Sequence, residues 1–323
     1  MRAITSNATA PIFAEVALPE PGKEEVLVKV KAGALNRIDL MMMKGAAHGG
    51  VGGMGIPLGV EWAGEIVALG SAVDNWKVGD RVMSAGFGAF AEYTLGHARR
   101  MLPIPAGLSY EQAATLPVGL QTMHDAIATN GQLAPGQTVL IQGASSGMGL
   151  LGMQIAKCLG AGLVIGSSTS PERRAKLKDF GADAVIDSSA PDWVEQVKHA
   201  TNGAGADLLV DLVAGPLVNG GMAALRVGGR MVNVGRVGGE SGDFNFDLHS
   251  MRRITYIGVS FRTRTGAEVA EVRVRALAAL GPALAEGSLR MPVDQVYRFD
   301  DAPAALERMA GNQHFGKIVL SLE

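Results

Sequence analysis

The second half of the sequence constrains the fold most, because short apolar segments there alternate regularly with longer amphipathic ones. Five apolar segments have the length and composition of β-strands: residues 138–143, 163–168, 182–187, 207–213 and 230–235. The segments between them have helical length, and one opens with an N-cap serine and a first-turn proline at Ser170-Pro171. Strands that alternate with helices predict a doubly wound parallel sheet in an α/β fold, which binds ligands beyond the carboxyl ends of its strands. A sixth strand is expected at 254–260, followed by an alanine-rich helix from about Glu268 to Ala285.

The first part of the chain has a shorter period, in which apolar and polar residues alternate between glycine turns. This pattern predicts a β-rich, barrel-like domain over residues 1–118. Residues 119–261 are expected to form the parallel-sheet domain, and residues 262–323 to return to the first domain through the closing strand "FGKIVLSLE". The 323 residues suffice for two domains of roughly 150 residues, each with a core of its own.

Composition and charge exclude several classes of protein. The chain carries 29 Lys and Arg against 31 Asp and Glu, so nothing in it is basic enough to bind a nucleic-acid backbone. The one cysteine, Cys158, excludes an internal disulfide and is predicted to be a small core residue, because its neighbours are apolar. The first residues lack the apolar segment of a signal peptide, and no apolar stretch is long enough to span a membrane. We therefore expect a soluble cytoplasmic enzyme without a nucleic-acid or membrane partner.

A glycine-rich loop, "GASSGMG" at residues 143–149, follows the first strand of the parallel-sheet region. A loop at this place opens a helix, where free backbone N–H groups and the helix dipole attract a pyrophosphate. The residues expected to contact a dinucleotide are Ser145, Ser146, Gly147 and Met148. Alanine and serine replace part of the usual G-x-G-x-x-G spacing, so a tight turn without a ligand is the alternative.

The end of the second strand indicates which dinucleotide is bound. A site that prefers NAD carries an acidic residue there for the ribose 2′-hydroxyl, whereas this chain has Ser168 and then Arg173 and Arg174. Hydroxyl and guanidinium groups hold a 2′-phosphate that a carboxylate would repel. NADPH is therefore the predicted cofactor, with Ser168 and Arg173 as ligands and Arg174 as a further candidate. The alternative is structural, with Ser170-Pro171 capping the helix and the arginines on its solvated face.

A glycine-rich loop of this kind also resembles the short-chain dehydrogenases, whose catalytic tyrosine is followed by a lysine four positions later. None of the four tyrosines here has that partner. The chain instead resembles the medium-chain dehydrogenase/reductase superfamily, most closely its zinc-free quinone oxidoreductase branch. The matching segments occur in the family's order: "AGALNRIDLMMMKG", "GVEWAGEIVALGSAVDNWKVGDRV", "GAFAEY", "AATLPVGLQTMHDAI", the loop at 143–149 and "FGKIVL". The resemblance implies a GroES-like catalytic domain, a Rossmann nucleotide domain and an active-site cleft between them.

The resemblance also bears on catalytic zinc. Zinc-dependent relatives have a cysteine where Asn36 stands, a histidine where Val60 stands and a further ligand near Val118, and none of these residues binds a metal. The cysteines of a structural zinc lobe are absent as well. We therefore predict metal-independent chemistry. Without a metal or a tyrosine–lysine pair, the hydride acceptor is expected to be activated by conjugation, as in a quinone or an α,β-unsaturated carbonyl.

Further site residues are assigned by this resemblance. Asn36 is expected to bind the nicotinamide ribose or the substrate carbonyl, and Asp39 and Met41 to border the substrate. Alternatively, Asn36 caps a turn, Asp39 is a scaffold carboxylate at a helix start, and the run Met41–Met43 packs in the core. The other residues implied to lie near the cofactor are Thr122, Ser188, Val234, Gly235, Arg236 and Lys317.

Two of these assignments have open alternatives. Lys317 is expected either near the cofactor phosphates or as an exposed structural lysine of the closing strand. The glycine-rich segment 45–57 is expected either to form a mobile loop beside the substrate or to serve as a connector.

The function predicted from sequence is a zinc-independent, NADPH-dependent reductase that transfers hydride to a quinone or a conjugated carbonyl. Two alternatives remain: an NADPH-binding protein with vestigial catalysis, and an enoyl or 2-alkenal reductase with a narrow range of unsaturated substrates. A homodimer is expected by resemblance, and because the edge of strand 254–260 can extend a sheet across a two-fold axis.

Overall fold

The computed structural model describes residues 1–7, 10–45, 47–48, 51–52 and 54–323, and the chain forms two compact units. The first unit contains Met1–Val118, Phe261–Leu277 and Met291–Glu323, and the second contains Gly119–Ser260 and Ala278–Arg290. The division after residue 118 coincides with the predicted domain boundary.

The C-terminal segment is divided differently from the prediction, which assigned all of 262–323 to the first unit. Residues 278–290 belong to the second unit. The reason is a reciprocal pair of hydrogen bonds, in which the Gln154 amide donates to the Arg290 carbonyl at 2.9 Å and accepts from the Arg290 N–H at 3.0 Å. This contact is made by a side chain from a distant part of the sequence, so local patterning does not reveal it.

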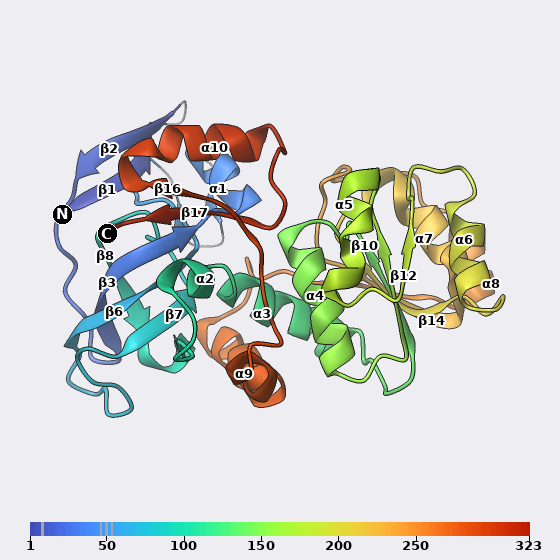
Figure 1. Cartoon of the computed structure of the whole chain (residues 1–323), viewed down its shortest axis with the longest axis horizontal. Helices are drawn as coiled ribbons and strands as arrows, with labels where there is room; N and C mark the ends of the chain where they lie inside the picture. Colours follow the sequence, from blue (N-terminus) through green and yellow to red (C-terminus); the bar gives the residue numbers. More distant parts are fainter. Residues whose placement is uncertain (8–9, 46, 49–50, 53) are drawn as a thin grey trace. The chain divides into compact units, whose positions relative to one another are not determined.

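The first unit is built on a seven-stranded sheet with the order β16–β17–β3–β6–β7–β9, in which β8 also pairs with β3 (Figure 1). Its strands are β3 (Glu25–Ala34), β6 (Glu61–Leu69), β7 (Arg81–Ala85), β8 (Tyr93–His97), β9 (Leu102–Pro103), β16 (Val293–Arg298) and β17 (Lys317–Ser321). The closing strand β17 pairs antiparallel with β3, with Val319 opposite Ala34, which confirms the predicted return of the chain end.

Shorter elements complete the first unit. They are β1 (Arg2–Ser6), β2 (Pro11–Glu15), α1 (Arg37–Met43), β4 (Ala47–His48), β5 (Val51–Gly52), α2 (Tyr110–Ala114), α10 (Ala302–Ala310) and 3₁₀ turns at Ala98–Arg100 and Phe299–Asp301. The core contains Trp62 of β6, Phe90 and Ile318 of β17, each with no exposed surface, and α10 adds Leu306 to it.

The second unit is the doubly wound parallel sheet expected from the sequence, with the strand order β12–β11–β10–β13–β14–β15. Its strands are β10 (Thr138–Gln142), β11 (Leu163–Ser167), β12 (Ala184–Ile186), β13 (Ala206–Asp211), β14 (Leu225–Asn233) and β15 (Thr255–Gly258). The order reverses beside β10, and ligands of such sheets bind at the carboxyl ends of the strands near this point. The sixth strand, β15, is an outer strand as expected, and the homodimer inferred from its edge stays a prediction.

Figure 1 shows α4 and α5 on one side of this sheet and α6, α7 and α8 on the other. The helices of this unit are α4 (Gly147–Cys158), α5 (Pro171–Ala175), α6 (Trp193–Ala200), α7 (Val218–Ala224) and α8 (Phe246–Arg252), with a π-helical segment at Asp125–Asn130 and 3₁₀ turns at Leu177–Phe180 and Gly215–Leu217. Two further helices, α3 (Pro117–His124) and α9 (Gly266–Ala285), each have residues in both units. Buried side chains of the strands and of α6 and α7, among them Leu140, Leu209 and Met222, form the core.

The prediction of a buried Cys158 is wrong, because this residue is exposed. Helix α4 is buried from Gly149 to Ala156, and its last turn emerges from the core with Lys157 half-buried and Cys158 exposed. Apolar neighbours in the sequence do not indicate where a helix extends beyond the elements that cover it. In the described part of the chain, no helix has the length and apolar character needed to span a membrane.

Candidate functional site

The loop predicted to bind a dinucleotide joins β10 to α4 in the second unit. Gly143 has φ +77°, a left-handed conformation that glycine adopts without strain, so the chain turns sharply after β10. The Ser146 hydroxyl accepts from the Gly149 N–H at 3.1 Å and caps α4. A Cβ on Gly149 would lie 2.5 Å from the Ala144 Cα, so a larger residue would push the helix from the loop. This tight turn, this close packing and the free N–H groups of the helix N-terminus fit a pyrophosphate.

The end of β11 lies against this loop. Ser168 is buried, and its hydroxyl donates to the Ser145 hydroxyl at 2.9 Å. The Arg174 guanidinium donates to the Ser168 carbonyl at 2.6 Å and pairs with the Asp187 carboxylate at 3.0 Å. Hydrogen bonds from Ser189 make the largest contribution to lowering the pKa of Asp187, and Arg174 lowers this pKa further. Arg174 is therefore already paired with a carboxylate.

Arg173 lies one residue earlier on α5 and is half-buried. Its backbone N–H donates to the Ser170 hydroxyl at 3.3 Å, and Pro171 occupies the first turn. The capping role considered for Ser170-Pro171 is thus present, and it uses only the backbone of Arg173. Ser188, a further predicted cofactor residue, is buried just after β12.

A strained turn follows β13. The buried Asp211 carboxylate accepts from the N–H groups of Val213 and Ala214, each at 2.8 Å. Burial raises the pKa of Asp211, and hydrogen bonds from Ala214, Val213 and Asn233 oppose that rise. The turn holds Ala214 at φ 59° and ψ −150°, a conformation that is strained for residues other than glycine. Strain of this kind is concentrated at binding and catalytic sites.

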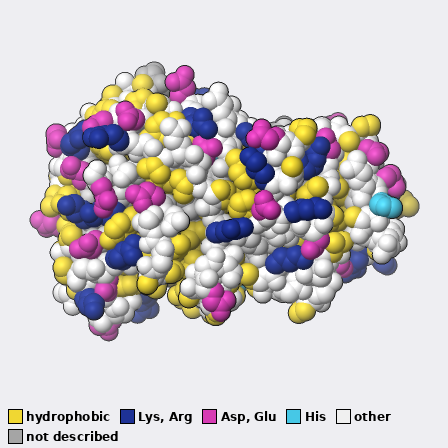
Figure 2. Space-filling view, in the orientation of Figure 1, with side chains coloured by type: hydrophobic (Ala, Val, Ile, Leu, Met, Phe, Trp, Pro, Cys, Tyr) yellow, Lys and Arg dark blue, Asp and Glu magenta, His cyan; other side chains and the backbone are white. Residues whose placement is uncertain are grey.

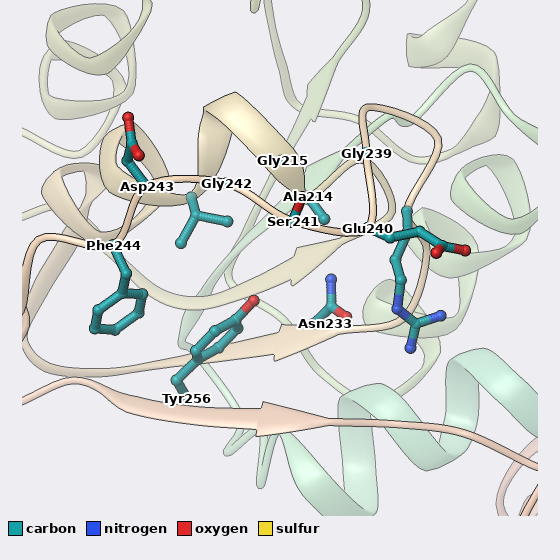
Figure 3. Close-up of a pocket in the computed structure, with 12 residues that line it drawn as sticks. Ala214, Gly215, Asn233, Gly239, Glu240, Ser241, Gly242, Asp243, Phe244 and Tyr256 are labelled. Atoms are coloured by element: carbon teal, nitrogen blue, oxygen red, sulfur yellow. The ribbon is translucent and has the colours of Figure 1, made fainter.

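A pocket of about 230 Å³ lies beside this turn (Figure 3). It is lined by Ala214, Gly215, Val218, Asn233, Arg236, Gly239, Glu240, Ser241, Gly242, Asp243, Phe244 and Tyr256. Figure 3 shows the Tyr256 hydroxyl and the Asn233 amide turned toward the same space. Burial, and then the charge of Asp211, raise the pKa of Tyr256, so its hydroxyl keeps its proton and can donate a hydrogen bond.

Three predicted cofactor residues lie at this end of the sheet. Arg236 lines the pocket, and Val234 and Gly235 immediately precede it. The N–H groups of Val234 and Gly235 both donate to the Asp211 carbonyl, at 2.8 and 3.1 Å. The turns after β13 and β14 are thus joined through Asp211, and together they offer donors and acceptors for a small polar group.

The first unit contains a buried polar cluster around Asn36. The Lys317 ammonium donates to Glu61 Oε1, to Asn36 Oδ1 at 2.6 Å and to the Leu35 carbonyl at 3.4 Å. The Asn36 amide donates to the same Glu61 oxygen at 2.8 Å, and the Val118 N–H donates to Glu61 Oε2 at 3.0 Å. Glu61 has no exposed surface, and Lys317 is 4% exposed. Both oxygens of the carboxylate therefore have donors, as a buried charge requires.

Asp39 is the second carboxyl of this cluster. It is fully buried; Oδ2 accepts from the Asn36 N–H at 2.6 Å, whereas Oδ1 has no hydrogen-bond partner among the described residues. Burial raises the pKa of Asp39 to about 7, although the Asn36 N–H and the Lys317 charge lower it. The helix-start role considered for Asp39 is therefore present, and this carboxyl can also exchange a proton near neutral pH.

One of the two predictions for Lys317 is wrong, and the other stays a prediction. Lys317 is buried at the start of β17, so it is not an exposed structural lysine. Its ammonium donates to three acceptors within the first unit, and its predicted place near the cofactor phosphates is not tested by these contacts. The main partner, Glu61, is 256 residues away in sequence, so the family resemblance of the closing strand did not reveal this pairing.

The residues of the methionine run, Met41–Met43, differ in how deeply they are buried. Met42 is buried in the core and the partly buried Met43 packs against it, whereas Met41 is 46% exposed, so core packing accounts for Met42 and Met43 but not for Met41. The place of Met41 beside a substrate stays a prediction, as does the cofactor contact of Thr122, which is half-buried in α3. Of the glycine-rich segment 45–57, residues 46, 49–50 and 53 lie outside the described residues.

Comparison with known proteins agrees with these two units. Residues 22–106 match the family described as "Alcohol dehydrogenase GroES-like domain", and residues 147–277 match "Zinc-binding dehydrogenase". The crystal structure of a probable oxidoreductase from Mycobacterium abscessus is 30% identical, with a TM-score of 0.84 over 100% of this chain and 99% of that one. The chain belongs to the medium-chain dehydrogenase/reductase superfamily.

Two further proteins are similar over most or all of this chain. A quinone oxidoreductase from Pseudomonas syringae pv. Tomato DC3000 is 26% identical, with a TM-score of 0.87 and complete coverage of both chains. A mycocerosic acid synthase-like polyketide synthase from Mycobacterium tuberculosis is 30% identical over 304 residues. That match covers 94% of this chain and 14% of the much longer synthase. The chain is therefore an oxidoreductase of the superfamily that uses nicotinamide cofactors.

The metal-independence predicted from sequence stays a prediction. Catalytic zinc takes three protein ligands, and no three His, Cys, Asp or Glu side chains are grouped to hold a metal among the residues that the structure describes. Two of the positions occupied by ligands in zinc-dependent relatives belong to the polar cluster instead. Asn36 contributes its amide and Val118 its backbone N–H, and both contact Glu61.

Glu61 is the residue of this superfamily member that sequence reasoning missed. A signal was available, because Glu61 interrupts an apolar segment predicted to be a strand, and Lys317 interrupts another. Charged residues are rarely fully buried unless they are paired, so two such residues in core strands indicate partners for each other.

Replacing Ala214 with glycine is expected to stabilise the second unit by about 1 kcal/mol, because glycine removes the strain at φ 59° at a smaller cost in chain entropy. The thermal midpoint of that unit should rise by roughly 2–4 °C. The matched control is Ala223→Gly inside α7, where glycine should lower stability by roughly 0.5–1 kcal/mol. A midpoint that falls equally in both variants would mean that Ala214 is not strained.

Proposed function

We propose that this protein is a zinc-independent, NADPH-dependent reductase that transfers hydride to a quinone or a conjugated carbonyl. The observation that carries the proposal is the end of β11, where the Ser168 and Ser145 hydroxyls meet at 2.9 Å beside two arginines. A site for NAD would have a carboxylate at this strand end. The Asp187 carboxylate nearby is paired with Arg174. We assign Arg173, on the same helix, to the 2′-phosphate.

The residues that would hold the dinucleotide lie in two places in the second unit, beside the loop between β10 and α4 and beyond the end of β14. Ser145 to Met148 and the N-terminus of α4 would bind the pyrophosphate, and Ser168 and Arg173 the adenosine 2′-phosphate. Val234 to Arg236, beyond β14, would bind the other end of the cofactor. When bound, NADPH supplies the hydride, and the protein contributes binding, orientation and electrostatics.

The acceptor is assigned from the groups that the protein offers. An unactivated ketone needs a metal or a positioned acid to stabilise the alkoxide that forms, and metals contribute several kcal/mol to such reactions. The described residues form no metal site, and no tyrosine in the sequence has a lysine four positions later. A quinone or enone spreads the arriving charge over its own conjugated system. The similarity to the quinone oxidoreductase of Pseudomonas syringae supports the same class of acceptor.

The experiment that tests this function follows NADPH oxidation with quinones, enones and matched saturated ketones, using protein dialysed against a chelator. Conjugated acceptors are expected to react faster than the saturated ketones, and removal of metals should leave the rates unchanged. Faster reduction of saturated ketones would show a catalytic acid or metal and would contradict the proposal. Turnover of a few related enones without any quinone would instead favour an enoyl or 2-alkenal reductase.

The alternative of an NADPH-binding protein with vestigial catalysis gives a different outcome in the same experiment, namely NADPH binding without oxidation by any acceptor. The charge distribution gives no support to an NADPH-binding protein that also binds nucleic acid. Figure 2 shows basic and acidic side chains interspersed over the visible face, whereas a nucleic-acid surface requires a basic stripe.

Arg173→Ala is expected to weaken NADPH binding by roughly 10- to 150-fold, since a lost charge-assisted contact costs about 1.5–3 kcal/mol. The affinity for NADH, which lacks the 2′-phosphate, should stay unchanged in a fluorescence titration. Lys178→Ala is the matched control, because it removes an exposed cation from the following 3₁₀ turn. Equal affinities of the wild type for NADPH and NADH would refute the choice of cofactor.

A further inference from the structure

Three polar side chains lie next to one another on one face of the parallel sheet. Gln142 ends β10 beside Asp211 of β13, and Asp211 in turn lies beside Asn233, which ends β14. Each follows by two residues a core residue of the face that α6 and α7 cover, so all three side chains leave the sheet on that face. Gln142 and Asp211 have no exposed surface, and Asn233 is 9% exposed. We call these three residues the polar row.

The polar row holds a carboxylate without a cation beside it. Oδ1 of Asp211 accepts from the N–H groups of Val213 and Ala214, whereas Oδ2 has no hydrogen-bond partner among the described residues. The other two members of the row are neutral amides, and neither polar atom of the Gln142 amide has a partner in the described part of the chain. Buried carboxylates are normally paired with a cation or a metal. The row therefore has a negative charge that the described protein does not compensate.

The hydrogen bonds of Asp211 connect this charge to the predicted cofactor site. Two N–H donors on one carboxylate oxygen favour its ionised form. The Asp211 carboxylate fixes the turn after β13, and its backbone carbonyl accepts from the N–H groups of Val234 and Gly235 after β14. One residue thus supports the segment that we assign to the nicotinamide end of the dinucleotide. The oxidised nicotinamide ring is a cation, whereas the reduced ring is neutral.

We infer that Asp211 supplies the negative charge that complements the oxidised nicotinamide ring, and so strengthens the binding of the oxidised dinucleotide. This inference rests on the proposed function, and it adds a residue that acts by charge from beneath the site. By thermodynamic linkage, a group that stabilises the bound oxidised form makes the bound reduced form a stronger hydride donor. The alternative is a neutral Asp211, with a proton on Oδ2 that is donated to the Gln142 amide oxygen.

The test measures binding without turnover. NADP⁺ and NADPH are titrated separately into the wild type and into Asp211→Asn, whose side-chain oxygen can still accept from the two N–H groups of the turn. We expect the variant to bind NADP⁺ roughly 10-fold more weakly and NADPH within roughly 2-fold of the wild type, because only the oxidised ring is charged. Adenosine 2′,5′-bisphosphate, which lacks the ring, should bind both proteins equally.

The matched control is Asp207→Asn. Asp207 lies near the other end of the same strand, where its carboxylate accepts from the Thr138 N–H at 2.8 Å and pairs with Arg226. This variant removes the same charge from the second unit, and it should keep the wild-type ratio of the NADP⁺ and NADPH affinities. If Asp211→Asn does not fold, the titrations are repeated with Asp211→Asn in the Ala214→Gly background, where glycine adopts the turn without strain.

Three results would overturn the inference. Equal weakening of NADP⁺ and NADPH, or a loss of affinity for the bisphosphate, would mean that Asp211 acts only by holding the structure together. Unchanged affinities for both dinucleotides would mean that its carboxyl is neutral. NAD⁺ and NADH give the same contrast without the 2′-phosphate, so they test Asp211 even if the choice of cofactor is wrong. A wild type that binds no dinucleotide would overturn the proposed function together with this inference.

Discussion

Replacing Lys317 with methionine is expected to lower the free energy of unfolding of the first unit by about 3–5 kcal/mol, since removal of one partner leaves the other charge buried and unpaired. Glu61 has no exposed surface, and its Oε1 would keep only the weaker, neutral donor of the Asn36 amide. This pair also connects the closing strand to the sheet, because Lys317 opens β17 and Glu61 opens β6. Loss of the ammonium should therefore loosen β17 first.

The measurement is hydrogen exchange of peptides from β3 and β17, together with denaturant unfolding of the whole protein. Lys31→Met is the matched single control, because its partner Glu323 is largely exposed, and such pairs contribute roughly 0–1 kcal/mol. The double variant Glu61→Gln/Lys317→Met should recover most of the loss, since replacing a whole buried pair is often close to neutral. An effect of Lys317→Met as small as that of Lys31→Met would show that Glu61 finds another compensating group.

The parts of the fold that could be predicted from sequence are those encoded by local patterns. The apolar period and the turn glycines predicted β10 to β15, and the loop at 143–149 was predicted from residues that are adjacent in the chain. Contacts between distant segments were not predictable in this way. The pairing of Glu61 with Lys317 and the packing of 278–290 through Gln154 both depend on side chains brought together only by the completed sheets.

In the candidate site, too, features encoded by local sequence were predictable and features that depend on contacts in the folded chain were not. Ser145 and Ser168 were placed at neighbouring strand ends by the fold type, and their hydroxyls do meet. The strain at Ala214 was not predictable, because it arises from the two N–H groups that turn toward a buried Asp211. Whether a charged residue acts on a ligand or on its neighbours is decided by burial, and sequence indicates burial only statistically.

Replacing Asp39 with asparagine is expected to change how the stability of the first unit depends on pH. Burial raises the pKa of Asp39 from 3.8 to about 7, so the folded protein holds a proton that the unfolded chain releases. The stability contributed by this group is complete below pH 3.8 and decreases as the pH rises to about 7. At about 1.4 kcal/mol for each pH unit, the cost above pH 7 is on the order of 4 kcal/mol.

An asparagine at this position is neutral at every pH, and its side-chain oxygen can still accept from the Asn36 N–H that Asp39 binds at 2.6 Å. The variant and the wild type should therefore be about equally stable near pH 4, and the variant should become more stable as the pH rises toward 8. Taking the difference between the two proteins at each pH cancels the titration of every other group. Asp247→Asn is the matched control, because Asp247 lies in the first turn of another seven-residue helix, α8, and is exposed. If the two proteins differ by the same amount at pH 4 and pH 8, Asp39 is ionised throughout this range, and a proton held at its unpartnered oxygen has no part in the chemistry of the site.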